Sequence, residues 1–103
     1  MNRLDRLLKM READPSDPDI PYMIAQEHAA QSAHDQALTL FDDALAIDPH
    51  YHYAYYHKAR SLVALEREQD AIEVLNEGLR RSQMAGDAKA ANEIGAFLAE
   101  LGA

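Results

Sequence analysis

The sequence predicts an all-α protein of six antiparallel helices. Apolar residues recur at helical spacing in six segments, and no segment shows the alternation expected of a strand. Connections of two to six residues separate the segments, so consecutive helices must pack antiparallel. Alanine is frequent and only 7% of residues are aromatic, which suits closely packed helices. We expect helices over residues 3–13, 18–31, 34–47, 52–65, 69–84 and 87–101.

The first two helices meet at a proline-rich corner. Leu4, Leu7, Leu8 and Met10 should form the apolar face of the first helix. Asp14-Pro15 ends this helix, because a residue that precedes proline is pushed out of the α region. Asp17 is then a suitable N-cap for the second helix, with Pro18 at its first position. The inner residues expected in the second helix are Tyr22, Ile24, Ala25, His28 and Ala29.

The third helix has the most regular apolar stripe of the chain. Small alanines alternate there with Phe41, so a neighbouring helix can approach closely and pack around the ring. Asp48-Pro49 ends the helix, as Asp14-Pro15 ends the first. The residues of this stripe are Ala37, Leu38, Phe41, Ala44 and Leu45.

The last three helices show the same helical spacing. Gly86 suits the end of the fifth helix, and Asp87 suits the N-cap of the sixth. The inner residues expected in the fourth helix are Tyr55, Ala59 and Leu62. Those of the fifth are Ala71, Ile72, Leu75, Gly78 and Leu79, and those of the sixth are Ile94, Phe97, Leu98 and Leu101.

The sequence also repeats with a fixed period. Pro15 and Pro49 each follow an aspartate, and the interval between these prolines returns further along the chain. It is about 34 residues, and a fixed period of this length indicates stacked copies of one helix pair. The pairs of residues that the same interval separates are Ala37 and Ala71, Phe41 and Leu75, and Ala44 and Gly78.

Residues 37–49 fit the pattern A-x3-F-x2-A-L-x3-P, which resembles the second helix of a tetratricopeptide (TPR) repeat, a family whose repeats have this period. The chain resembles small bacterial proteins that consist of little more than two such repeats. The resemblance implies a right-handed superhelix whose first helices line a concave face that binds peptides or partner proteins. It divides the single domain, 1–103, into a half-repeat helix (1–15), repeats at 18–51 and 52–85, and a capping helix (87–101).

The family's geometry places six residues on that concave face. Tyrosine and arginine are the side chains that most often anchor an interface. Some TPR domains hold a chaperone's terminal carboxylate with lysines and asparagines, but Tyr22, Gln26 and His57 occupy the corresponding places here. The alternative is a shallow surface without a ligand. The predicted concave-face residues are Tyr22, Gln26, Tyr53, Tyr56, His57 and Arg60.

Charge and composition exclude several functions. The net charge is −8, and because residues 1–12 carry a local +2, the rest of the chain carries −10. This acidic balance argues against nucleic acid as a partner. No apolar run approaches the length of a membrane span, and the N-terminus lacks the uninterrupted apolar core of a signal peptide. We therefore expect a cytoplasmic protein.

Residues that could carry chemistry do not form a recognisable set. No nucleophile–base arrangement or phosphate-binding loop appears, and the chain has no cysteine. His50, His52 and His57 are not at the i, i+4 spacing of helical metal ligands. The acidic pairs Asp42-Asp43 and Glu73/Glu77 should be solvated on outward sides of their helices. We expect no enzyme activity, no metal and no cofactor.

Two functions remain. In the first, the protein is an adaptor or scaffold that binds a protein or peptide partner on its concave face. In the second, it is a structural repeat module that associates with itself, with the basic first helix of one copy against the acidic body of another. The sequence is compatible with a monomer or with weak self-association.

Overall fold

A computed structural model describes all 103 residues and contains six helices without a strand, as predicted. The helix bounds lie within two residues of those expected. Prolines, left-handed turns and N-caps set where the helices begin and end. The helices are α1 (Arg3–Ala13), α2 (Asp19–Ala30), α3 (His34–Ile47), α4 (His52–Ala64), α5 (Glu68–Met84) and α6 (Ala88–Glu100).

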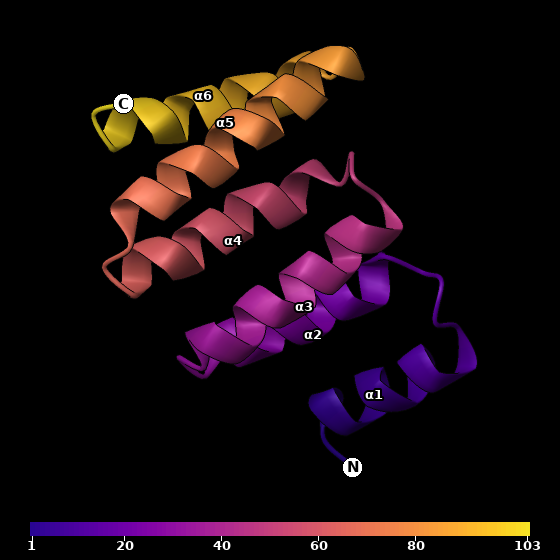
Figure 1. The fold of residues 1–103 in the computed structure, drawn as a ribbon. Helices are drawn as coiled ribbons and strands as arrows, with labels where there is room; N and C mark the ends of the chain where they lie inside the picture. The colour runs from indigo at the N-terminus through magenta and orange to yellow at the C-terminus, as the bar shows by residue number, and fades with distance from the viewer.

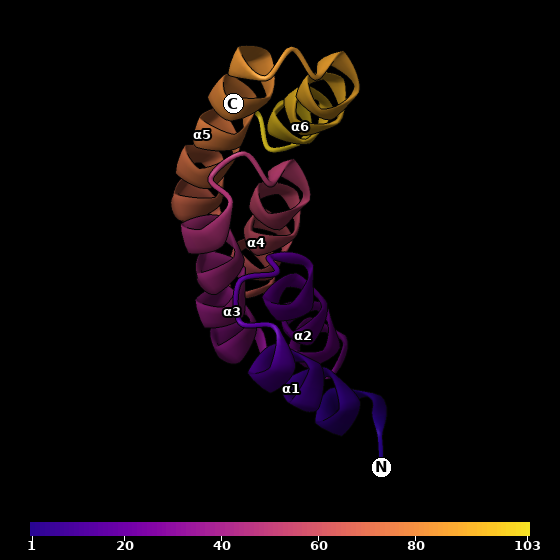
Figure 2. The ribbon, with the colours of Figure 1, turned by 90° about the vertical axis from the view of Figure 1, so that its right-hand side faces the viewer.

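The helices form a curved stack (Figure 1). Figure 2 shows α2, α4 and α6 along the inner side of the curve, and α3 and α5 along the outer side. The helix α1 lies at the N-terminal end, where it packs on α2. This arrangement is the predicted superhelix of antiparallel helix pairs, and its inner side is the concave face.

Small buried residues let neighbouring helices approach closely. Ala25 of α2, Ala37 and Ala44 of α3, and Ala54 of α4 are fully buried around the ring of Phe41. A second group of buried residues joins α4, α5 and α6. Its members are Ala59, Leu62, Ala71, Leu75, Ile94, Phe97 and Leu98.

Tyr55 of α4 packs closely against Gly78 of α5. A Cβ added at Gly78 would lie 2.7 Å from the Cβ of Tyr55 and 3.0 Å from its Cγ. The Tyr55 hydroxyl donates to the carbonyl of Pro49 at 2.7 Å, which holds the ring in place. A side chain at residue 78 would therefore push these helices apart.

Four helices end in the same left-handed turn. The residues with positive φ are Ser32 (60°), Glu66 (60°), Gly86 (70°) and Gly102 (75°). In each case the next residue's N–H donates to a carbonyl five residues back, as from Arg67 to Leu62 at 2.8 Å. Of these four residues, only Gly86 was predicted from the sequence to end a helix.

The apolar face of α1 is narrower than expected. Leu7 is buried (4% exposed), but Leu8 (44%) and Met10 (47%) face solvent. This difference arises because α1 packs against α2 and has no helix on its other side. The helix α2 therefore covers only a narrow stripe of α1, about one residue per helical turn.

The start of α2 differs by one residue from the prediction. Pro18 is the N-cap residue, and the helix begins at Asp19. Asp17 still performs the expected capping, because its Oδ1 accepts a hydrogen bond from the N–H of Asp19 at 2.9 Å.

Two glycine-to-alanine variants test the close helix packing. Gly78→Ala should lower the free energy of unfolding by about 1 kcal/mol or more, because overpacking outweighs alanine's higher helix propensity. Gly95→Ala is the matched control, since a Cβ there meets no atom within 4 Å. This control should raise stability by up to about 1 kcal/mol. Urea unfolding measures both values, and a stabilising Gly78→Ala would show that the packing described here is wrong.

Candidate partner-binding groove

A pocket of about 390 Å³ lies between α2 and α4 on the concave face. Residues of α2, α3 and α4 surround it, and we refer to it below as the groove. Its lining consists of Gln26, Ala29, Ala30, His34, Phe41, His57, Arg60, Ser61 and Ala64.

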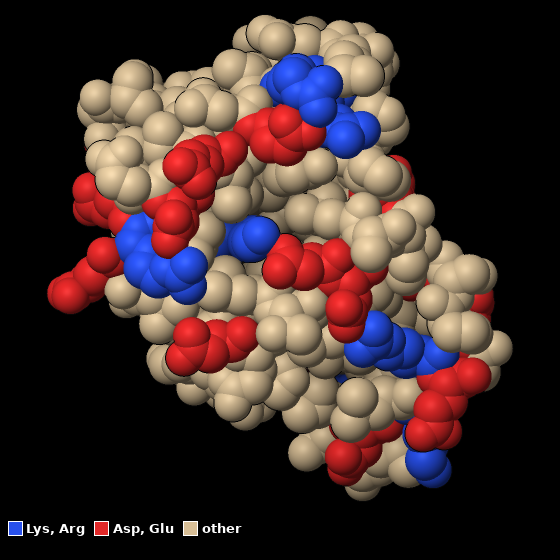
Figure 3. Space-filling view, viewed as in Figure 1, with Lys and Arg blue, Asp and Glu red and all other residues tan.

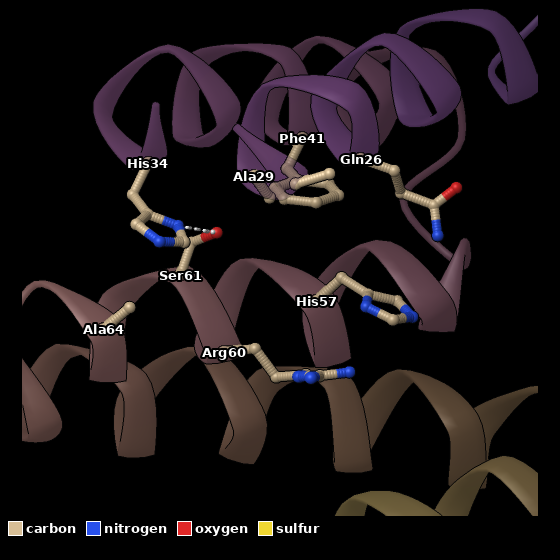
Figure 4. A pocket seen from close by; sticks show the side chains of 9 residues that line it. Gln26, Ala29, His34, Phe41, His57, Arg60, Ser61 and Ala64 are labelled. Atoms are coloured by element: carbon tan, nitrogen blue, oxygen red, sulfur yellow. Dashed lines mark hydrogen bonds between the residues drawn. The ribbon is translucent and has the colours of Figure 1, made fainter. Parts of the chain in front are cut away.

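The groove has an apolar middle and polar ends (Figure 4). Phe41 and Ala29 lie in the middle, and the ring of Phe41 is almost fully buried. At one end, Nδ1 of His34 lies 3.1 Å from Oγ of the buried Ser61, so the two share a hydrogen bond. Gln26 and His57 lie toward the other end. An extended peptide could therefore place an apolar side chain between two polar ones.

A row of aromatic rings runs beside the groove along the concave face. The ring of Tyr22 lies 5.0 Å from Tyr51 and 5.8 Å from His57. The rings of His57 and Tyr56 are 5.4 Å apart, and Tyr56 lies 5.1 Å from Phe97 of α6. These centroid distances fall in the range of favourable aromatic contacts. The row thus connects the first repeat with the C-terminal helix.

Hydrogen bonds fix two tyrosines of this row. The hydroxyl of Tyr22 accepts from Nε2 of Gln26 at 3.0 Å, and that of Tyr51 donates to Oδ1 of Asp19 at 2.6 Å. Burial raises the pKa of both tyrosines, so they stay protonated at neutral pH. Because these rings are already fixed, their side chains would lose less conformational entropy when a partner binds than mobile side chains would.

Arg60 is the only Lys, Arg, Asp or Glu that lines the groove. Six of the ten Lys and Arg side chains form ion pairs, but the guanidinium of Arg60 forms none. Its hydrogen-bond donors are therefore available to a partner. The six paired cations are Arg3, Arg11, Lys58, Arg67, Arg80 and Arg81.

Burial and the neighbouring Arg60 lower the pKa of His57. Both effects disfavour the imidazolium, so His57 is neutral at pH 7. At neutral pH the positive charge at this end of the groove is therefore that of Arg60 and not of His57.

The predicted concave-face residues lie together, with one at the margin. Gln26, His57 and Arg60 line the groove, and Tyr22 and Tyr56 contact the His57 ring. Tyr53 is 40% exposed, does not line the groove, and lies against the ring of His52 at 4.4 Å.

The hydrogen-bonded pair of His34 and Ser61 was not predicted from the sequence. These residues are 27 positions apart, on different helices, and neither belongs to an apolar stripe. The only available signal was a polar residue, Ser61, at an inward position beside Leu62. Their hydrogen bond shows how a buried hydroxyl is satisfied at this end of the groove.

The carboxylates of Asp42 and Asp43 are partly exposed on the outer face, as expected, and both also form ion pairs. Asp42 pairs with Lys58 at 2.6 Å, and Asp43 pairs with Arg11 at 2.7 Å. Acidic and basic side chains alternate over this face, as Figure 3 shows. The carboxylates are thus held by cations of neighbouring helices.

Glu77 illustrates the same pairing within one helix. Arg80 and Arg81 both donate to its carboxylate, and these bonds lower the pKa of Glu77 to about 2. A group with this pKa is a poor general base at neutral pH.

Two further features bear on function. No three His, Asp or Glu side chains lie close enough together to bind a metal ion. None of the helices has the length and apolar character needed to cross a membrane.

The lowered pKa of His57 predicts how stability depends on pH. The unfolded chain binds a proton at His57 near pH 6.5, whereas the folded chain does so only at lower pH. The unfolded state therefore binds more protons in this interval, and stability should fall as pH decreases from about 7 toward 5. Thermal melts of the wild type and of His57→Gln would measure this contribution. A fall of the same size in both proteins would contradict it.

Comparisons with known proteins agree with this architecture. Two tetratricopeptide repeat family models match the chain, one over residues 28–92 and the other over residues 2–52. A search of curated proteins found no match.

Solved structures include several similar proteins. A tetratricopeptide repeat domain protein from Salinibacter ruber, solved by NMR, is 32% identical, covers 85% of this chain and 89% of its own, and has a TM-score of 0.79. The TPR2B domain of yeast Sti1, in complex with pHsp70, has a TM-score of 0.88 at 20% identity, over 96% of this chain and 79% of its own. A protein from Bordetella parapertussis has a TM-score of 0.85 at 24% identity, over 99% and 89%. With its repeat period, its helix stack and these matches, the chain belongs to the tetratricopeptide repeat family.

Proposed function

We propose that this protein is an adaptor that binds an extended segment of a partner protein in the groove between α2 and α4. TPR domains are generally protein–protein interaction modules. The observation that carries the proposal is the combination of an apolar middle, fixed aromatic rings and an unpaired arginine on one concave surface. Aromatic residues and arginine contribute most of the binding energy at many interfaces.

The groove is short, so the expected affinity is modest. A pocket of about 390 Å³ accommodates only a few side chains. Such a contact typically gives a dissociation constant on the order of micromolar. A small adaptor of this kind acts through reversible contacts, which suits the cytoplasmic location that we propose for it.

Self-association is a second candidate, and the exposed face of α1 favours it. Leu8 and Met10 are partly exposed there, and Lys9 between them forms no ion pair. Head-to-tail contact of this face with the acidic body of another copy would give larger assemblies, because such contacts need not close. Sedimentation at low and high salt separates the two candidate functions. A protein that is monomeric at both salt concentrations would exclude self-association.

Catalysis is not part of the proposal. Asp42 and Asp43 on the outer face are held in ion pairs. In the groove, the one hydroxyl beside a histidine is that of Ser61, and it is buried. TPR repeats are typically interaction modules rather than enzymes.

Blocking the groove should weaken binding of a peptide selected from a random library against the wild-type protein. Ala64 ends α4, lines the groove and is exposed, so Ala64→Trp fills the groove without overpacking the core. We expect the dissociation constant to rise at least tenfold, which corresponds to about 1.4 kcal/mol. Fluorescence anisotropy of the labelled peptide measures this change.

Ala46→Trp is the matched control. Ala46 is exposed near the end of α3 and does not line the groove. The same bulk at this position should change the dissociation constant by less than about twofold, because surface substitutions away from a site have small effects. Binding that survives Ala64→Trp but is lost in Ala46→Trp would place the site on the outer face.

A further inference from the structure

The two ends of the helix stack carry faces that no helix of the chain covers (Figure 2). Within the chain, α2 packs with α3 and α4 packs with α5, whereas α1 packs only on α2, and α6 only on α5 and α4. We propose that a second copy of the chain covers these faces head to tail, with its α1 packed beside α6 of the first copy. This inference goes beyond binding in the groove, and it names the surface that α1 contacts in self-association.

The two end helices are of different kinds. The helices α1 and α3 end in the same way, at the C-cap residues Asp14 and Asp48, which each precede a proline. The helices α4 and α6 are both 13 residues long, so their residues correspond one to one from the N-cap residues Tyr51 and Asp87. Thus α1 is equivalent to the second helix of a pair, and α6 is equivalent to the first. One α6 and one α1 together supply the helices of a further pair.

The uncovered side of α6 is the side on which α5 packs in α4. Tyr55 and Ala59 of α4 are buried there, and Tyr55 lies against Gly78 of α5. Counted from the N-caps, the equivalent residues of α6 are Ala91 and Gly95, and both are only partly buried. A Cβ added at Gly95 would meet no atom within 4 Å. There is therefore room on α6 for a second helix to approach closely.

The uncovered side of α1 is the one that would face such a first helix. Met10 of α1 is equivalent to Ala44 of α3 and Gly78 of α5, which are both buried. Gly78 lies between Tyr55 of α4 and Ile94 of α6, so this position faces the first helix of the same pair as well as the next one. Met10 has no such first helix before it, and its side chain is 47% exposed.

The sizes of the side chains make the two faces complementary. Inside the chain, the large Tyr55 lies against Gly78, which has no side chain. At the ends the order of sizes is reversed, because the small Ala91 takes the place of Tyr55 and Met10 takes the place of Gly78. A flexible methionine side chain fills the space that a small residue leaves. This reversal favours the α6 of another copy as the occupant of the α1 face.

The two helices also carry opposite net charge. Arg6 and Lys9 of α1 are exposed and form no ion pair. In α6, Glu93 and Glu100 form no ion pair, and the helix has a single cation, Lys89. Opposite charges steer α1 toward α6, whereas contact between two basic α1 helices would bring like charges together. The charges therefore favour a head-to-tail contact over a two-fold contact between α1 helices.

Met10→Glu and Leu8→Glu form a matched pair of variants for the α1 face. Both residues are exposed to a similar extent, but Leu8 is equivalent to Asp42, which remains exposed on the outer face of α3. Sedimentation equilibrium should show that the wild type associates as its concentration rises. We expect Met10→Glu to lower the association constant at least tenfold, and Leu8→Glu to change it by less than about twofold.

Gly95→Trp and Ala96→Trp form the matched pair for α6. A side chain at residue 95 enters open space in the single chain, so Gly95→Trp blocks the approach of another helix without disturbing the core. Ala96 is exposed and is equivalent to Arg60, which faces the groove and not α5. Gly95→Trp should also lower the association constant at least tenfold, and Ala96→Trp should leave it within about twofold. Far-UV circular dichroism checks that each variant keeps its helices.

Mixing the two blocked variants tests the head-to-tail arrangement itself. Met10→Glu keeps an intact α6 face, and Gly95→Trp keeps an intact α1 face. Each variant alone should be monomeric, and an equimolar mixture should form a dimer of twice the 11.5 kDa chain mass that does not grow further. The proposal is overturned if the mixture stays monomeric, if either blocked variant associates as the wild type does, or if the wild type is monomeric up to about 1 mM.

The failure of this proposal can be separated from the failure of groove binding. No residue that lines the groove belongs to α1 or α6. The library-selected peptide should therefore bind Met10→Glu and Gly95→Trp with the dissociation constant of the wild type, within about twofold. A chain that stays monomeric but binds this peptide in a manner that Ala64→Trp blocks would refute the head-to-tail contact and leave groove binding intact.

Discussion

The fold depends on close approach between helices at small buried residues. Ala37 and Ala44 of α3 have no exposed surface, and Ala71 and Gly78 occupy the same positions one repeat later in α5. Each lets the adjoining first helix come near, as the contact of Tyr55 with Gly78 shows. Because the same spacing returns in each repeat, successive helix pairs stack with similar geometry and the chain curves (Figure 2). The concave face is a consequence of this repeated contact.

The repeat also distributes chemistry between the two faces. Tyr22 and Tyr56 are one repeat apart, as are Gln26 and Arg60, so equivalent positions on α2 and α4 point to the same surface. Packing against α3 holds these helices in place, which leaves their inward-curving sides free for a partner. On the outer face, cations such as Lys58 neutralise nearby carboxylates. The groove is therefore lined by an unpaired cation, Arg60, although the protein as a whole is acidic.

The sequence predicted the helices, and placed three of the nine groove-lining residues on the concave face, because their signals are local or periodic. Apolar spacing placed Phe41 in the core, and the repeat period placed His57 and Arg60 on one face. Features set by tertiary context were not predictable in this way. Glu66 adopts a positive φ although its side chain has no preference for it, because the turn must reverse the chain between packed helices. The exposure of Leu8 likewise depends on the lack of a helix beyond α1, which the leucine spacing does not reveal.

The central claim is that a partner segment lies on the concave face, and paramagnetic NMR tests it most directly. A nitroxide attached to the library-selected peptide broadens the amide signals of nearby residues of the bound protein. We expect the strongest broadening at Gln26, His57 and Ala64, which line the groove on α2 and α4. Strongest broadening around Asp42 and Asp43 on α3, with those groove signals unaffected, would contradict it.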